Sequence, residues 1–329
     1  MKYPIVIVTA LVVIFASLFV WWNSITKPPS SDNTARDFLI TKGISASAIG
    51  TKLHKEGFIK SPFAFKIYVY FTEKAGKIPA GEYRLTADKR LSQIVDQLIK
   101  GPSEIWVTIP EGLRREEIAE RFASSFEQSE EFVEGFLSAS DGAEGYLFPD
   151  TYLFPKDASA SAVVTKMKTT FDKRLDSGMR KDIETSEYDL DEIVTMASIL
   201  ERETITTEER PIVAGILYKR LEAGWALQAD AAVQYAVASS KTNSQNLKLE
   251  NYWEALTKED LEVNSQYNTY KYRGLPPAPI CSPGLSSIEA AINPQESDYW
   301  FYLHDPEEKI HYAQTIDEHN QNVAKYLGK

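Results

Sequence analysis

The helical spacing of residues 188–203 aims one glutamate at the side of the helix that carries a row of apolar residues. The apolar residues recur at i, i+3, i+4 and i+7 and are Leu190, Ile193, Val194 and Ala197. Glu201 follows four residues later on the same face, whereas Glu203 lies roughly 200° around the helix and is predicted to face solvent. A carboxyl group among apolar neighbours is protonated more easily, which suits a proton donor. The alternative is a last-turn glutamate that merely reaches water.

Four further clusters combine polar and aromatic side chains. They occupy residues 144–152, 227–230, 265–280 and 310–320. Amide, carboxylate and aromatic groups together are what hydrogen bonding and stacking to a carbohydrate require. Loops rich in Pro, Asn and Tyr are also common for purely structural reasons. The composition of these clusters leaves both interpretations open.

Other chemistries find little support in the composition. The net charge is −11 and no Lys/Arg cluster is present, which argues against a nucleic-acid partner. The single cysteine, Cys281, excludes an internal disulfide framework and a thiolate metal cluster. His311 and His319 lack a zinc-binding spacing, and no nucleophile elbow or phosphate-binding glycine loop occurs. We therefore expect neither a metal nor a cofactor.

The N-terminus is predicted to anchor the chain in a membrane. Residues 5–22 are uncharged and almost wholly apolar, and eighteen helical residues span about 27 Å, close to the thickness of a bilayer's hydrocarbon core. Trp21 and Trp22 stand at the end of this run, where aromatic rings favour the headgroup layer. A cleaved signal peptide is the alternative, but it would have a shorter apolar core and a small-residue cleavage site. The simplest topology is a short cytoplasmic tail, residues 1–4, with everything after the span on the other side.

The rest of the chain mixes helices and strands without βαβ alternation, which predicts an α+β fold. A polar linker, residues 23–35, precedes a small unit at 36–104 and a larger one at 105–329. In the small unit we expect helices at 46–56 and 91–99, a helix or a helix–strand passage at 62–71, and a turn leading into a strand within 76–85. In the larger unit we expect strands at 105–109 and 299–303, a loop-rich region at 238–284, and helices at 114–122, 129–138, 160–177, 188–203, 208–223, 286–292 and 315–326.

Several of these motifs together resemble the MltG/YceG-like endolytic murein transglycosylases. The run from Ala197 to Thr204 is similar to the family's Ala-Ser-Ile-x-Glu-x-Glu signature. The other matching motifs follow in the same order and are Glu144-Gly145, Phe148 to Tyr152, Leu227-Gln228 with Asp230, Tyr267 to Tyr270, Gly274 to Pro277, Pro283-Gly284, Asn293-Pro294, and His311 before Glu318 to Asn320. The resemblance covers nearly everything after residue 36 and implies a LysM-like domain at 36–104 and a catalytic domain at 105–329.

The resemblance implies a lytic reaction on peptidoglycan in which Glu201 is the only acid and base. The enzyme would cut the β-1,4 bond from N-acetylmuramic acid to N-acetylglucosamine and close a 1,6-anhydro ring. Ordinary glycosidases instead need two carboxyl groups. The candidate sugar-binding residues are Asp150, Gln228, Asp230, Tyr267 and Asn268, whereas Glu203 is expected to be a surface or supporting residue.

The family also implies partners and a location. The implied partners are peptidoglycan strands, the cytoplasmic membrane and cell-wall synthases. The catalytic domain would lie outside that membrane and act as a terminator of strand elongation. Departures from the family pattern, such as Gln266 before Tyr267 and Ile310 before His311, affect the expected shape of the sugar cleft. Two alternatives stay open. One is a two-carboxylate hydrolase that pairs Glu201 with Asp150 or Asp230, and the other is a non-catalytic glycan-binding scaffold for synthases.

Overall fold

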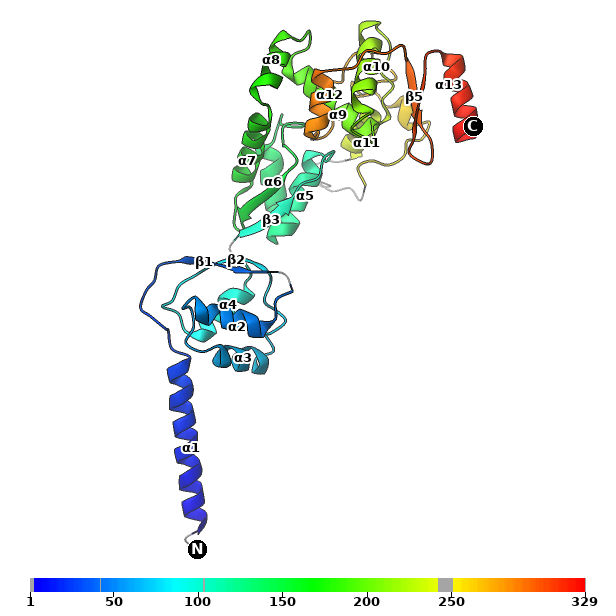
Figure 1. Cartoon of the computed structure of the whole chain (residues 1–329). Helices are drawn as coiled ribbons and strands as arrows, with labels where there is room; N and C mark the ends of the chain where they lie inside the picture. The colour runs from blue at the N-terminus through cyan, green and yellow to red at the C-terminus, as the bar shows by residue number, and fades with distance from the viewer. Residues whose placement is uncertain (1–2, 42, 103, 242–250, 329) are drawn as a thin grey trace. The chain divides into compact units, whose positions relative to one another are not determined.

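The computed structural model divides the chain into two compact units (Figure 1). The first contains residues 1–106 and 153–157, and the second contains residues 107–152 and 158–329. The structure describes the chain except for residues 1–2, 42, 103, 242–250 and 329. Helices and strands are mixed in both units, so the predicted α+β class is confirmed. Within the described part of the chain, no helix is both long enough and apolar enough to cross a membrane.

In the first unit, two antiparallel strands pack against short helices. Its elements are α1 (Tyr3–Ile25), β1 (Arg36–Ile40), α2 (Ala46–Lys55), α3 (Pro62–Phe71), β2 (Gly81–Leu85) and α4 (Leu91–Ile99). The strands pair from Arg36 opposite Leu85 to Ile40 opposite Gly81. Alternate residues such as Phe38 and Ile40 are buried, because successive strand residues face opposite sides. The sequence had not indicated β1, whose polar start obscures its alternation.

The second unit is mostly helical. Two strands belong partly to each unit: β3 (Glu104–Thr108) starts in the first unit, and β4 (Thr151–Pro155) ends in it. The other elements of the second unit are α5 (Arg115–Phe126), α6 (Glu130–Ala139), α7 (Ala160–Arg174), α8 (Ser177–Thr185), α9 (Leu190–Glu203), α10 (Arg210–Glu222), α11 (Asp230–Lys241), η1 (Asp260–Glu262), α12 (Leu285–Ile292), β5 (Phe301–His304), β6 (Ile310–Ala313), α13 (Ile316–Asn322) and η2 (Val323–Leu327). β5 and β6 pair antiparallel, from Phe301 opposite Ala313 to His304 opposite Ile310.

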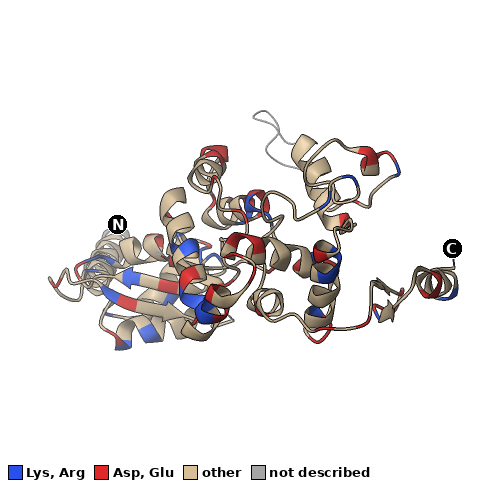
Figure 2. Ribbon diagram, turned by 90° about the horizontal axis from the view of Figure 1, so that it is seen from above, with Lys and Arg blue, Asp and Glu red and all other residues tan. Residues whose placement is uncertain are grey.

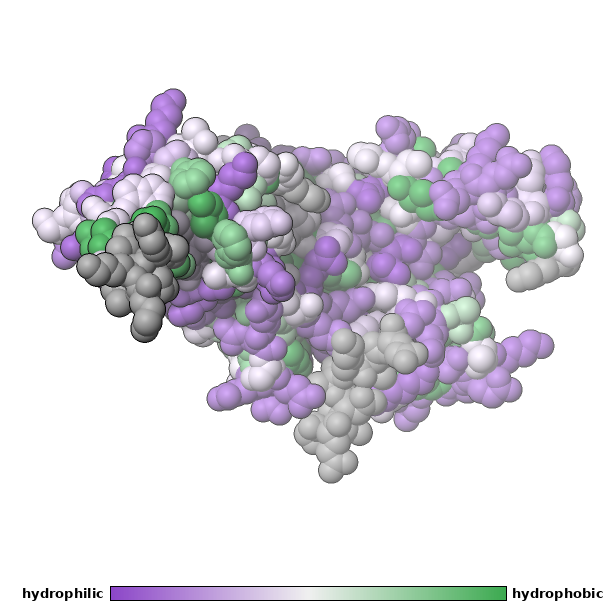
Figure 3. All heavy atoms as spheres, turned by 90° about the horizontal axis from the view of Figure 1, so that it is seen from below, coloured by the Kyte–Doolittle hydropathy of each residue, from purple (hydrophilic) through white to green (hydrophobic). Residues whose placement is uncertain are grey.

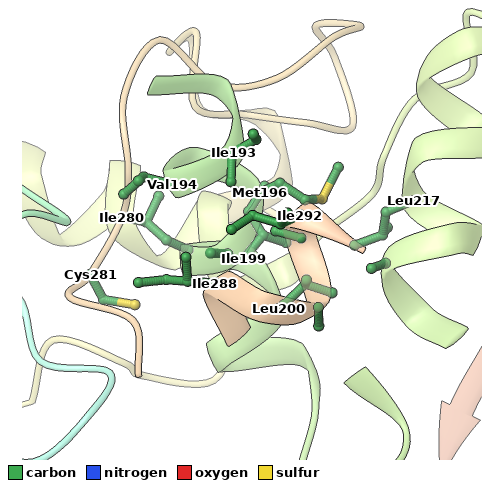
Figure 4. Packing of buried hydrophobic residues seen from close by; sticks show 14 of the residues in the cluster. Ile193, Val194, Met196, Ile199, Leu200, Leu217, Ile280, Cys281, Ile288 and Ile292 are labelled. Atoms are coloured by element: carbon green, nitrogen blue, oxygen red, sulfur yellow. The ribbon is translucent and has the colours of Figure 1, made fainter. Parts of the chain in front are cut away.

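Helix α9 lies at the centre of the core of the second unit. Every residue from 193 to 200 is buried, so the helix is enclosed on all sides rather than on the single face that its periodicity indicated. Its apolar side chains pack against Ile288 and Ile292 of α12, Leu217 of α10 and Ile280 from the preceding loop (Figure 4). An Asp189–Glu192 capping box begins the helix by satisfying its first backbone N–H groups. The helix is therefore a rigid support for side chains at its last turn.

The surface carries charges of both signs. Lys and Arg residues are interspersed with Asp and Glu residues along the ribbon (Figure 2). The face drawn in Figure 3 is largely hydrophilic, and its hydrophobic residues gather in small groups.

Gly215 provides a test of the packing between α10 and the segment after α12. A methyl group on Gly215 would lie 2.0 Å from the backbone oxygen of Gln295, which cannot move aside freely because its own N–H donates to the Pro211 carbonyl. We expect Gly215→Ala to lower the free energy of unfolding by about 2 kcal/mol, as overpacking does. Urea unfolding followed by tryptophan fluorescence measures the change.

Gly135 in α6 supplies the matched control. A methyl group there would meet only Ala160, at an ordinary 3.5 Å. Alanine is the better helix former by about 1 kcal/mol, so Gly135→Ala should stabilise the protein. Equal midpoints for Gly215→Ala and the parent would contradict the close approach of α10 to Gln295.

Candidate active site

Glu201 lies in the last turn of α9, and its side chain is only 7% exposed. Oε2 accepts hydrogen bonds from the Gly284 N–H at 2.9 Å and the Ser287 hydroxyl at 2.7 Å. Oε1 accepts a hydrogen bond from the Arg210 guanidinium at 3.2 Å. The prediction that Glu201 faces inward is therefore confirmed. The prediction that it is alone among apolar groups is wrong, because a cation and two neutral donors fix its carboxylate.

The partners of Glu201 come from segments that the core holds in place. Ser198, one turn earlier on α9, is fully buried, and its hydroxyl accepts a hydrogen bond from the Ile280 N–H at 3.0 Å. The Cys281 thiol donates to the Ser198 carbonyl at 3.3 Å, so Cys281 acts as a packed structural residue. These two contacts join the loop before α12 to α9. That loop in turn places the Gly284 N–H, at the start of α12, against the Glu201 carboxylate.

A second carboxylate, Glu111, lies on the other side of Gly284. A methyl group on Gly284 would lie 2.0 Å from Oε1 of Glu111, so only a glycine leaves room for this approach. The Glu111 loop is fixed by two backbone hydrogen bonds, Gly112 N–H to the Ser282 carbonyl at 2.9 Å and Ser282 N–H to the Leu113 carbonyl at 2.8 Å. Burial and the negative charge of Glu201 raise the pKa of Glu111, and Arg210 partly opposes that rise.

The three charged groups form one cluster with a net charge of −1 when both carboxyl groups are ionised. Within this cluster Glu111 takes up a proton more readily than a solvated glutamate, because burial and the charge of Glu201 raise its pKa. It can also release that proton, because Arg210 stabilises the ionised form. This is the behaviour that general acid and base catalysis requires. Glu111 comes two residues after the strand expected at 105–109, and no local sequence pattern connects it with Glu201.

Glu203 is not the solvent-facing residue that the sequence predicted. It accepts a hydrogen bond from the Tyr302 hydroxyl at 3.1 Å and lies near Asp230 and Arg220. Burial raises the pKa of Glu203 to about 7. The prediction is wrong because β5, which carries Tyr302, covers the face of α9 that the helical period assigned to water. Periodicity alone cannot show which elements cover a helix.

Because Glu203 is buried, the stability of the protein should depend on pH, and Glu203→Gln should weaken that dependence. A folded-state pKa near 7 exceeds the unfolded value of about 4.5, so the folded state binds the extra proton between these pH values. Stability is therefore lost as pH rises from about 4.5 to 7, in total by roughly 3 kcal/mol. Glutamine keeps an acceptor for Tyr302 without a charge.

Glu203→Gln should accordingly match the parent below pH 5 and be more stable above pH 7. Thermal unfolding from pH 4.5 to 8 measures the difference between the two proteins. If the unfolding temperatures of the two proteins changed with pH in parallel over that range, a raised Glu203 pKa would be refuted. The substitution would then have removed no group that titrates differently in the folded and unfolded states.

The candidate sugar-binding residues lie in different surroundings. Asp230 is exposed and accepts a hydrogen bond from the Tyr270 hydroxyl at 2.5 Å, and Gln228 is exposed next to it. Tyr267 is half-buried and stacks on Tyr235 with ring centres 4.7 Å apart. Asn268 is fully buried, and its amide nitrogen donates to the Leu261 and Val263 carbonyls, both at 2.9 Å. Gln228 and Asp230 can therefore reach a ligand directly, whereas Asn268 holds the loop together.

Asp150 belongs to the framework rather than to the Glu201 cluster. Burial raises its pKa, but the hydrogen bonds from Arg174 and the Thr151 N–H outweigh this effect, so the pKa is lowered overall. In the same predicted cluster, Glu144 is buried and accepts the Arg115 N–H at 3.2 Å, at the start of α5. Burial, together with Glu116, raises the pKa of Glu144 to about 8. The carboxylate that the structure brings to Glu201 is thus Glu111.

The histidines have separate structural partners. His311 lies 2.7 Å from Asp305 and stacks on Tyr326, and His304 lies 3.2 Å from Glu209. Among the residues described, no group of three or more His, Cys, Asp or Glu side chains is arranged to hold a metal ion.

The chain matches known proteins over nearly its whole length. The profile of the YceG-like family matches residues 38–325. A protein named endolytic murein transglycosylase from Bacillus subtilis is 29% identical, over 95% of this chain and 91% of the relative. A protein of the same name from Streptococcus pneumoniae is 30% identical over 88% of this chain, which spans only 58% of that relative. A crystal structure of a putative YceG-like protein from Listeria monocytogenes is also similar, with a TM-score of 0.55, 30% identity and coverage of 88% of this chain and 99% of that one.

Proposed function

The chain belongs to the YceG-like family, and on that basis we propose that it is an endolytic lytic transglycosylase acting on peptidoglycan. Such an enzyme is a lyase that cleaves the β-1,4 bond from N-acetylmuramic acid to N-acetylglucosamine without water. The observation that carries the proposal is the fixed, nearly buried Glu201 carboxylate beside Arg210 and Glu111.

Glu201 is the acid and then the base of this reaction. In its protonated form it gives its proton to the oxygen that leaves with N-acetylglucosamine. The resulting carboxylate takes the proton from the muramyl C6 hydroxyl, whose oxygen attacks C1 and closes the 1,6-anhydro ring. The proton is returned to Glu201, so no net proton is consumed. Arg210, Ser287 and the Gly284 N–H hold the carboxylate for the second step.

Gln228 and Asp230 are proposed to hydrogen-bond the sugars, because both are exposed and Asp230 is oriented by Tyr270. Tyr267 is proposed to contribute a stacking surface for a sugar ring. Asn268 and Asp150 are proposed to support the site indirectly, by holding their own loops in place through hydrogen bonds to the Leu261 carbonyl and to Arg174. The remaining features of the proposal come from sequence. They are a LysM-like domain at 36–104, a catalytic domain at 105–329, and membrane attachment through residues 5–22 with action outside the cytoplasmic membrane. Phe15 and Phe19 in that segment are 70% and 72% exposed, so burying them in lipid would be favourable.

Product analysis tests the proposed reaction. Isolated glycan strands are incubated with the full-length protein, and the new ends are identified by mass spectrometry. Anhydro-muramyl ends support the lytic transglycosylase, whereas reducing ends identify a hydrolase. No turnover above background would instead favour a scaffold that binds glycan strands and recruits synthases.

A two-carboxylate hydrolase is the second candidate function, and one observation favours it. Glu111 lies next to the Gly284 whose N–H holds Glu201, so the site contains the second carboxyl group that hydrolysis needs. The partners expected from sequence for such a hydrolase, Asp150 and Asp230, are instead bound by Arg174 and Tyr270.

A further inference from the structure

A cavity of about 540 Å³ lies beside Gln228, between the turn that follows α10 and the segment after Thr269. Its lining includes Trp225, Tyr270, Lys271 and Arg273. The volume falls within the range of small-ligand sites, roughly 300–1,000 Å³. Apart from Gln228 and Tyr270, these side chains have no role in the reaction proposed above.

Buried hydrogen bonds fix the walls of this cavity. Thr269, which is 1% exposed, accepts the Gln228 N–H at its carbonyl (3.2 Å) and the Ala229 N–H at its hydroxyl (2.9 Å). Arg220 is buried behind the cavity and donates to the carbonyls of Leu227 and Trp300, both at 2.9 Å. A cavity with walls fixed in this way loses little entropy when a ligand binds.

Three side chains in the lining are available to a ligand. Trp225 stacks on Trp300 with ring centres 4.7 Å apart, yet it remains 45% exposed. In the described residues, no hydrogen-bond or ion-pair partner of the Arg273 guanidinium or the Gln228 amide is found, whereas Lys271 pairs with Glu262 at 2.8 Å. Gln228 also has a φ of +56°, a backbone conformation that non-glycine residues keep mainly where the surroundings impose it, and often at functional sites.

We propose that this cavity binds a carboxylate-bearing peptide carried on the glycan strand, an inference that rests on the proposed function. The planar fork of Arg273 matches a carboxylate in two parallel hydrogen bonds, and the Trp225 ring covers aliphatic carbons. Gln228, which is proposed to bind the sugars, lies where the sugar and its peptide would meet. The sugar rings are neutral, and in a peptide-bearing strand the lactyl carboxyl group of N-acetylmuramic acid is tied up in an amide bond, so neither would use the guanidinium. The net charge of the chain is −11, so most of its surface repels an acidic polymer. The positive charge of Arg273 therefore makes this pocket one of the places that attract a carboxylate.

Two substrates separate peptide binding from sugar binding. Glycan strands that carry their peptides are compared, using the full-length protein, with bare strands. In the bare strands an amidase has removed the peptides and the lactyl carboxyl groups thus exposed have been converted to methyl amides. We expect Arg273→Gln to raise KM about tenfold on peptide-bearing strands, the size of one charge-assisted hydrogen bond, with kcat unchanged. On bare strands the variant should behave like the parent.

Two further variants control for charge and geometry. Lys173→Gln removes one positive charge from the exposed side of α7 and should leave both substrates unaffected. Arg273→Lys keeps the charge but not the fork, so its KM on peptide-bearing strands should lie between those of the parent and Arg273→Gln. An equal rise of KM on both substrates, or no rise on either, would overturn the proposal.

A binding measurement tests the proposed carboxylate site independently of turnover. Calorimetry with a soluble muramyl peptide should show binding to the parent that weakens about tenfold in Arg273→Gln. The same peptide with amidated carboxyl groups should bind the parent as weakly as the free acid binds the variant. Identical affinities in all three titrations would refute a carboxylate site, even if the parent cleaved no strands and the proposed function itself failed.

Discussion

Replacing Glu201 with glutamine is expected to lower kcat on isolated glycan strands by at least about a thousandfold, with KM nearly unchanged. Glutamine keeps the shape of the side chain and its contact with Ser287, but it can neither give a proton to the leaving oxygen nor take one from the C6 hydroxyl. General acid–base catalysis contributes about 10²–10⁴-fold, and here one group serves both steps. Release of soluble anhydro-muramyl fragments, measured under initial-rate conditions, gives the two constants.

A matched control is available a few residues along the chain. Glu208 is exposed in the segment between α9 and α10, so Glu208→Gln removes the same charge without touching the site and should cleave like the parent. Circular dichroism of both variants establishes that they are folded. If Glu201→Gln cleaved strands as fast as Glu208→Gln, the assignment of a catalytic role to Glu201 would be refuted.

The sequence was sufficient to identify the α9 helix and to place Glu201 on its inward side. Both follow from a local rule, because a helical period is a property of neighbouring residues. The length of α4 was predicted correctly for the same reason. At 62–71 the sequence left a helix and a helix–strand passage open, and the structure has the helix α3. Strand β6 and helix α11 were missed. β6 is four residues long and is stabilised mainly by its pairing with β5, which no local pattern reveals.

The composition of the site depends on contacts between distant residues, which the sequence could not predict. Glu111 and Glu201 meet only because the buried Ser198 binds the loop that contains Gly284, and because backbone hydrogen bonds join the Glu111 loop to Ser282. The incorrect assignment of Glu203 has the same origin, since Tyr302 reaches it from β5. The isolated apolar acid expected from sequence is in fact part of a charged cluster.

Glu111→Gln is expected to lower kcat by about a hundredfold and to leave KM within a factor of about three. Cleavage of a glycosidic bond passes through a transition state with positive charge at C1, which a nearby carboxylate stabilises. Glutamine removes that charge while still fitting against Gly284. The same fragment-release assay measures the effect, with Glu134→Gln, on the exposed face of α6, as the control.

The response of this variant to azide separates the two candidate reactions. If Glu111 only stabilises charge, added azide leaves the rate of Glu111→Gln unchanged, and the remaining product still carries 1,6-anhydro ends. If Glu111 is instead the nucleophile of a hydrolase, azide replaces it, restores turnover and yields a glycosyl azide, because a small anion can occupy the space of the lost carboxylate. We expect the first result, since the muramyl C6 hydroxyl supplies a nucleophile within the substrate and leaves Glu111 no bond to form. A parent-like rate for Glu111→Gln would show that the second carboxylate has no part in either reaction.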